Sequence, residues 1–339
     1  MTAKLSEKAK RPGVHYAVTR DGVELPVIDV THPAFALTVS DSEQRALIDE
    51  FLEEDLRQNQ LPKPVRKVLW WFFLRGSALG QGIRQAQGSF MTGMHTYLLK
   101  IGPGMLGSAY AKPIDRKIAA SLPAMGVRLR LQDVAQLMVD VLKPALLEDS
   151  RRPLRFVNIA GGPAADSLNA LFLLNKQSPG ILAERQVTIE VLDRDEIGPE
   201  FGSASLAAVS SDGGSLSKIR SVFRHISYDW SEAQNLEQIL NADDSGNSLI
   251  ICSSEGGLFE YGSDEEIQAN LRVLRACPNV LAVVGSVTRA DEPMQRLRRN
   301  STLSTRPRGL DIFGKLVQPT GWSISRAIER PFSDQVVLT

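Results

Sequence analysis

Two adjacent glycines stand where an apolar segment gives way to a helical pattern. The segment 156–160 leads into Gly161 and Gly162, and leucines at helical spacing follow. A small-residue turn between a strand and a helix lets a ligand approach the backbone and the positive end of the helix. A tight turn that binds nothing has the same composition, so both interpretations stay open. The turn is not the dinucleotide fingerprint, because Pro163 and Ala165 stand where glycines are needed.

Carboxylates follow the next two apolar runs. Asp193 comes directly after the run 187–192, where a carboxylate can accept hydrogen bonds from both hydroxyls of a ribose. Asp229 and Trp230 follow the run 223–227 and could border a base, one by accepting a hydrogen bond from an amine and the other by stacking. The alternatives are a solvated loop for Asp193 and a helix N-cap for Asp229.

A polar, glycine-rich loop follows the fourth run, 248–252. It begins with Ser253, Ser254 and Glu255 and extends to Tyr261, after which a helical pattern opens. Open α/β sheets bind their ligands at the carboxyl ends of central parallel strands. We therefore interpret this loop as one wall of a site.

The elements that must position these residues form a βαβ pattern. Five apolar runs, beginning at residues 155, 187, 223, 248 and 280, are separated by 32, 36, 25 and 32 residues. Such gaps accommodate crossover helices between parallel strands. The last two runs, 322–328 and 335–338, start only 13 residues apart and predict an antiparallel hairpin. The prediction is a Rossmann-like, doubly wound α/β sheet of seven strands, mostly parallel, that ends in this hairpin.

The first 150 residues have a different sequence pattern. Residues 1–40 predict a β-ribbon with its turn at Asp21 and Gly22. Residues 41–150 predict a mainly helical cap or dimerisation region, with helices near 42–52, 65–74, 81–101, 113–122 and 131–147. The aromatic cluster 70–73 must be buried, and if it lines the pocket, the acceptor molecule is apolar or aromatic.

From residue 151 to 339 the order of parts resembles the class I S-adenosylmethionine-dependent methyltransferases. The reversed terminal strand is the feature that most separates this family from dinucleotide dehydrogenases. The family's acidic residue and G-x-G-x-G motif would lie on Asn158, Ala160, Gly162 and Ala164, so asparagine replaces the acid and alanine replaces two glycines. The loop 254–261 is similar to loops of small-molecule and carboxyl O-methyltransferases.

The resemblance implies S-adenosylmethionine as cofactor and assigns roles to residues of this chain. Asp193 would hold the ribose hydroxyls, and the remaining expected cofactor-binding residues are Asn158, Ala160, Gly161, Gly162, Asp229, Trp230, Ser253 and Ser254. For catalysis the candidates are His95, Glu255 and Tyr261. Methyl transfer needs an aligned donor and acceptor in a dry pocket, and a hydroxyl acceptor can need a base. His95 could equally be a packed core residue.

Composition restricts the partners. The 39 Lys and Arg balance 39 Asp and Glu, which gives no support for a nucleic-acid partner, and the arginines in 296–308 are read as a solvated helix face or an anion contact. The start of the chain lacks an apolar run, and the seven apolar residues 68–74 are too few to cross a bilayer, so a cytoplasmic protein is expected. Cys252 and Cys277 suit a reducing compartment, and no metal site is predicted.

Three functions compete at this point. The first is methyl transfer to a small molecule, most simply at oxygen, by a protein that could form a homodimer. The second is a methyltransferase fold that binds or assembles without catalysis, which the altered glycine motif suggests. The third is a nicotinamide-dependent oxidoreductase, which the missing glycines and the closing hairpin disfavour.

Overall fold

The computed structural model describes residues 10–60, 62, 76–85, 91–107, 110, 112–241, 247–300 and 303–339. The predicted helix 65–74 and its aromatic cluster lie outside these residues. The first elements along the chain are β1 (Tyr16–Val18), β2 (Glu24–Pro26), α1 (Asp41–Asn59), α3 (Ala78–Gln85), α4 (Gly93–Ile101), α5 (Pro113–Ala119) and α6 (Leu122–Glu148). The sheet region follows with β3 (Leu154–Ile159), α7 (Ala165–Gln177), β4 (Gln186–Leu192), α8 (Ile197–Ser210), β5 (Arg220–Ile226), α9 (Ala233–Asn241), β6 (Leu249–Ser254), α10 (Leu258–Tyr261), α11 (Asp264–Ala276), β7 (Val280–Thr288), α12 (Glu292–Asn300), α13 (Gly309–Val317), β8 (Ile324–Arg330) and β9 (Ser333–Leu338).

Seven strands form one sheet in the order β5-β4-β3-β6-β7-β9-β8. The strands β3 to β7 are parallel to one another, and β9 is antiparallel to both β7 and β8. The predicted fold class and the terminal hairpin are therefore confirmed. Every residue of β3, β6 and β9 is buried, as expected for strands covered on both faces.

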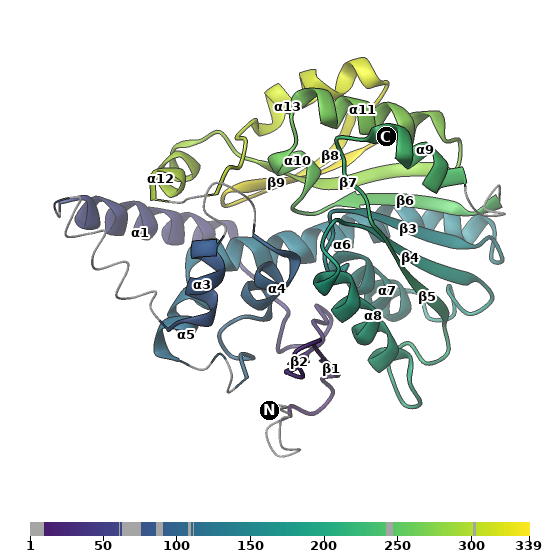
Figure 1. The fold of residues 1–339 in the computed structure, drawn as a ribbon, viewed down its shortest axis with the longest axis horizontal. Helices are drawn as coiled ribbons and strands as arrows, with labels where there is room; N and C mark the ends of the chain where they lie inside the picture. Colours follow the sequence, from purple (N-terminus) through teal and green to yellow (C-terminus); the bar gives the residue numbers. More distant parts are fainter. Residues whose placement is uncertain are drawn as a thin grey trace.

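Two layers of helices cover the sheet (Figure 1). On one face lie α6, α7 and α8, whose apolar side chains share a core with Phe156, Ile189 and Val284. On the other face α9, α11 and α13 enclose a second core that includes Ile159 and Val283. Since neighbouring residues of one strand contribute to different cores, the sheet is apolar on both sides.

The N-terminal segment forms the predicted ribbon, because β1 and β2 pair antiparallel with Tyr16 opposite Pro26. The helix predicted at 131–147 begins earlier, at Leu122, where the Ser121 side chain accepts a hydrogen bond from the Ala124 backbone. Serine caps helix N-termini well, so the apolar stripe marks only the later part of this helix. The helix α6 packs along α7, β7 and β9, and the proposed division at residue 150 stays a prediction.

The described helices include none that is both long enough and apolar enough to cross a membrane. Cys252 is fully buried in β6 and Cys277 is partly buried, and both are free thiols.

Candidate functional site

The carboxyl ends of β3 and β6 meet at the centre of the sheet. The chain leaves β3 toward β4 on one side and leaves β6 toward β7 on the other, so these two neighbours form the point where the strand order reverses. Asn158 on β3 lies opposite Ser253 on β6. Ligands of open α/β sheets bind in the crevice at such a point.

The turn after β3 has an unusual backbone conformation, which a hydrogen bond to Asp193 stabilises. Ala160, Gly162 and Ala164 all adopt positive φ angles of 55°, 52° and 52°. The backbone N–H of Gly162 donates to Asp193 Oδ2 at 2.9 Å, and the N–H of Asp195 donates to Asp193 Oδ1 at 2.9 Å. Burial raises the pKa of Asp193, and these two donors act against that rise. Asp193 therefore joins the end of β4 to the glycine turn.

Beneath the turn lies a buried pair, Asn158 and Asp166. The Asn158 amide Nδ2 donates to Asp166 Oδ1 at 2.5 Å, and a Cβ on Gly161 would come within 1.6 Å of Asn158 Oδ1. Only glycine at 161 leaves room for this side chain. Two buried side-chain oxygens of this pair have no hydrogen-bond partner among the described residues: Asn158 Oδ1 and Asp166 Oδ2.

Two other segments of the chain pack closely on this turn through glycines. A Cβ on Gly93, at the start of α4, would lie 2.7 Å from Gly162 Cα, and a Cβ on Gly257 would lie 2.5 Å from Ala160 Cβ. Real side chains do not approach so closely, so glycine is needed at both positions. The helix α4 and the loop after β6 thus cover the glycine turn.

A chain of buried charges joins the cap helices to this loop. Lys100 on α4 pairs with Glu255 Oε2, Arg130 on α6 donates to Glu255 Oε1 at 2.9 Å, and Arg130 also donates to Glu260 Oε1 at 2.9 Å. The four side chains are 7–9% exposed. Burial alone would raise the pKa of Glu255, but the neighbouring charges of Lys100 and Arg130 outweigh it and lower that pKa. We call these four residues the ion-pair chain.

The three candidate catalytic residues differ in what their side chains can do. Glu255 is held on both oxygens by the ion-pair chain. Burial raises the pKa of Tyr261, so its phenol stays protonated at neutral pH. His95, in the first turn of α4, has its Nδ1 2.8 Å from Thr92 Oγ1, and burial lowers its pKa. Of the three, the neutral imidazole is the group suited to accept a proton.

The remaining predicted cofactor-binding residues after β5 are Asp229 and Trp230. Asp229 accepts from the backbone N–H of Ser231 at 3.0 Å and pairs with Arg194 at 3.2 Å. The first contact closes a turn, and because α9 begins only at Ala233, Asp229 is not the N-cap that was its alternative. Trp230 packs against the second core. His225 lies in β5 with Nε2 2.9 Å from the Asp193 carbonyl oxygen.

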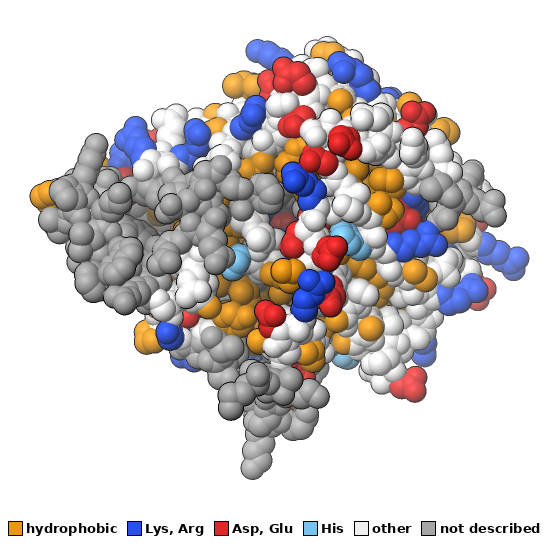
Figure 2. Space-filling view, in the orientation of Figure 1, with side chains coloured by type: hydrophobic (Ala, Val, Ile, Leu, Met, Phe, Trp, Pro, Cys, Tyr) orange, Lys and Arg blue, Asp and Glu red, His pale blue; other side chains and the backbone are white. Residues whose placement is uncertain are grey.

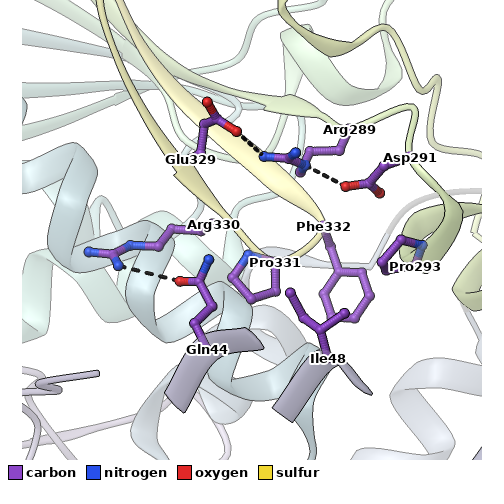
Figure 3. A pocket seen from close by; sticks show the side chains of 9 residues that line it. All are labelled: Gln44, Ile48, Arg289, Asp291, Pro293, Glu329, Arg330, Pro331 and Phe332. Atoms are coloured by element: carbon purple, nitrogen blue, oxygen red, sulfur yellow. Dashed lines mark hydrogen bonds and ion pairs between the residues drawn. The ribbon is translucent and has the colours of Figure 1, made fainter. Parts of the chain in front are cut away.

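Two cavities open near the carboxyl edge. One, of about 320 Å³, lies beside the end of β5 and is lined by Arg20, Glu196, Pro199, Glu200, Ser203, Phe223 and His225. The other, of about 130 Å³, lies between α1 and the β8–β9 turn, where Arg289 bonds Asp291 and Glu329 (Figure 3). Among the residues coloured by type in Figure 2, acidic and basic side chains are interspersed.

Sequence reasoning missed Asp166, Lys100 and Arg130. Asp166 carried a weak signal, since an acidic residue in the first turn after a glycine turn can face the strand end. Lys100 and Arg130 carried none, because each lies within an ordinary helical pattern far along the chain from Glu255.

In the predicted basic cluster, Arg308 is buried and pairs with Asp264 at 2.8 Å, so it has a structural contact.

No protein-family model matches the chain, and no curated protein matches its sequence. Among solved structures, the mitomycin 7-O-methyltransferase MmcR is similar at 13% identity and TM-score 0.40, over 82% of this chain and 73% of that one. The S-adenosylmethionine-dependent methyltransferase SibL is similar at 15% identity and TM-score 0.37, over 89% of this chain and 80% of that one. An O-methyltransferase family protein from Burkholderia thailandensis is similar at 14% identity and TM-score 0.39, over 68% of this chain and 60% of that one. At such identities the comparisons assign no role to any residue. The strand order of the chain itself identifies its fold as Rossmann-like α/β with a reversed seventh strand.

Proposed function

We propose that the protein transfers a methyl group from S-adenosylmethionine to an oxygen atom of a small, apolar or aromatic molecule. The observation that carries the proposal is the reversed strand β9 inserted between β7 and β8. The resemblance drawn from the sequence implies this arrangement, and a dinucleotide dehydrogenase sheet lacks it. Fold alone does not establish function, so the proposal also needs the site.

The residues at the carboxyl edge fit the cofactor in two respects. Asp193 lies at the end of β4 with a carboxylate that has capacity for further donors beyond Gly162 and Asp195. The unpartnered oxygens of Asn158 and Asp166 could accept from a polar group of the ligand. Because α4 contacts the glycine turn through Gly93, a cofactor bound at this turn would lie beside α4.

The cofactor supplies a methyl group on a positively charged sulfur, which makes that carbon electrophilic. In this proposal the chain aligns the two reactants and excludes water from them, and both effects accelerate a displacement. His95 receives the proton of a hydroxyl acceptor, since its lowered pKa keeps the imidazole neutral. Glu255, saturated by Lys100 and Arg130, holds α4 and α6 against the loop.

A second candidate function is binding or assembly without catalysis. It is favoured by the close contacts of Gly93 with Gly162 and of Gly257 with Ala160, which leave the backbone of the turn covered. If this packing is permanent, no cofactor enters. Cofactor binding therefore separates the two candidates.

The test is isothermal titration with S-adenosylhomocysteine, and in parallel with NAD⁺ and NADH. We expect the homocysteine compound alone to bind, and Asp193→Asn to weaken it at least tenfold. Asp212→Asn is the matched control, because Asp212 is exposed in a turn outside the site. Binding of neither compound would favour the non-catalytic candidate, and binding of NAD(H) alone would favour an oxidoreductase.

A further inference from the structure

The larger of the two cavities lies beside β5, the edge strand of the sheet, and α8 (Figure 1). Its volume of about 320 Å³ falls within the range of small-molecule sites. Three segments far apart in the chain form its walls. The turn between β1 and β2 contributes Arg20, the start of α8 contributes four residues, and β5 contributes Phe223 and His225. No role in methyl transfer has been proposed above for any of these residues.

Carboxylates outnumber cations in this cavity. Arg20 Nε donates to Glu200 Oε2 at 2.5 Å, and Arg20 Nη2 lies 3.6 Å from Glu196 Oε2, so one guanidinium serves two carboxylates. The side chains of Glu196 and Glu200 are 72% and 48% exposed, and a ligand in the cavity can therefore reach them. Because one carboxylate is in excess, the cavity favours a cation over an anion.

The wall formed by β5 combines a hydrogen-bond acceptor with an aromatic ring. His225 Nε2 lies 2.9 Å from the Asp193 carbonyl oxygen, which only accepts, so Nε2 carries the proton and Nδ1 of the neutral imidazole is an acceptor. The Phe223 ring packs against α8 at Gly202, where a Cβ would come within 2.8 Å of the ring. Aromatic rings attract cations and also contact apolar groups.

We propose that this cavity binds a small organic amine. The ammonium group pairs with Glu196 and Glu200, and it has three donors with which it can also reach a neutral acceptor such as His225 Nδ1. The apolar or aromatic part of the amine lies against Phe223 and Pro199. This binding site goes beyond the proposed methyl transfer and does not depend on it.

Three probes that share a benzene ring test the preference for a cation: benzylamine, benzyl alcohol and benzoate. At pH 7 the first is a cation, the second is neutral and the third is an anion. Binding is followed through the backbone amide NMR signals of residues 196–203 and 223–225. We expect benzylamine to shift these signals saturably and to bind about threefold more tightly than benzyl alcohol, as is typical of partly exposed ion pairs. Benzoate should bind most weakly.

Two substitutions test the two parts of the site. Glu196→Gln should weaken benzylamine about threefold and leave benzyl alcohol unchanged, because it removes a charge and preserves shape. Phe223→Leu should weaken both compounds, since both lose the aromatic contact, and benzylamine more strongly because it also loses a cation–π contact. The matched control is Glu237→Gln, since Glu237 is exposed on α9 outside the cavity, and it should change neither affinity.

The proposal is overturned if no probe shifts these signals, if benzoate binds as tightly as benzylamine, or if Glu196→Gln leaves the benzylamine affinity unchanged. It is also overturned if saturating S-adenosylhomocysteine displaces benzylamine, because the cavity would then belong to the cofactor site. If S-adenosylhomocysteine does not bind at all, the proposed function fails. The three probes and the substitutions still decide the amine site in that case.

Discussion

Replacing Glu255 with glutamine removes one charge from the ion-pair chain and nearly preserves the shape of the side chain. Glu255 pairs with both Lys100 and Arg130, and Arg130 keeps a second partner in Glu260. After the substitution, two buried cations share one carboxylate. One positive charge is then buried without compensation.

The expected cost is large because all four side chains are less than a tenth exposed. Removing one partner of a buried pair destabilises proteins by about 3–5 kcal/mol, since the remaining charge keeps its desolvation penalty. Folded proteins of ordinary stability unfold with about 5–15 kcal/mol. Glu255→Gln should therefore lose a substantial fraction of the total stability.

A second substitution tests whether charge balance is the cause. Lys100→Met in the Glu255→Gln background removes the excess cation and leaves Arg130 paired with Glu260 at 2.9 Å. The double variant should be more stable than Glu255→Gln alone by about 2 kcal/mol or more, because only neutral groups replace the lost pair. The exposed pair Glu53 and Arg57 is the control: Glu53→Gln should cost less than ~0.5 kcal/mol.

Urea denaturation followed by circular dichroism measures all of these variants. The sign of the pH dependence follows from the lowered folded-state pKa of Glu255. Its stabilisation is present above the unfolded pKa and is lost as the pH falls through the folded one, so the gap between the unaltered protein and Glu255→Gln should narrow in acid. The reasoning is refuted if Glu255→Gln costs less than ~1 kcal/mol at pH 7, or if the two substitutions simply add.

Three further outcomes are expected. Gly161→Ala should destabilise the protein by ~2 kcal/mol or more in urea titrations, because the new Cβ would come within 1.6 Å of Asn158 Oδ1; an unchanged midpoint would show that Asn158 can move away without cost. Burial raises the pKa of Asp334 to about 6, so its charged form is disfavoured in the fold and its contribution to stability falls as the pH rises from about 4 to 6. Asp334→Asn should flatten the stability profile in that window, and a parallel profile would contradict the assignment. His95→Gln should lower kcat for a hydroxyl acceptor by about 10²–10⁴-fold with S-adenosylhomocysteine affinity unchanged; equal loss of both would indicate a packing role instead.

The sequence determined the sheet and its polarity. Apolar runs separated by crossover-length gaps require parallel strands, and a gap of 13 residues between the last two requires a hairpin. The strand directions and the hairpin depend on the local apolar pattern and on the number of residues between strands, and both can be read from a single sequence. It followed that Asp193, Asn158 and Glu255 come at strand ends on one edge of the sheet.

Tertiary structure alone decided which side chains meet there. Lys100 and Glu255 are 155 positions apart, and nothing in their local patterns pairs them. The packing of α4 over the glycine turn is also absent from the local sequence pattern, because it depends on Gly93 and Gly162 being close in space. Asp166 is near Asn158 in the chain, but its unpartnered oxygen becomes visible only once every neighbour is placed. Hydrogen bonds and ion pairs act over only a few ångströms, so they can be identified only once the folded chain brings the partners together. Periodicity and spacing, in contrast, can be read from the sequence itself.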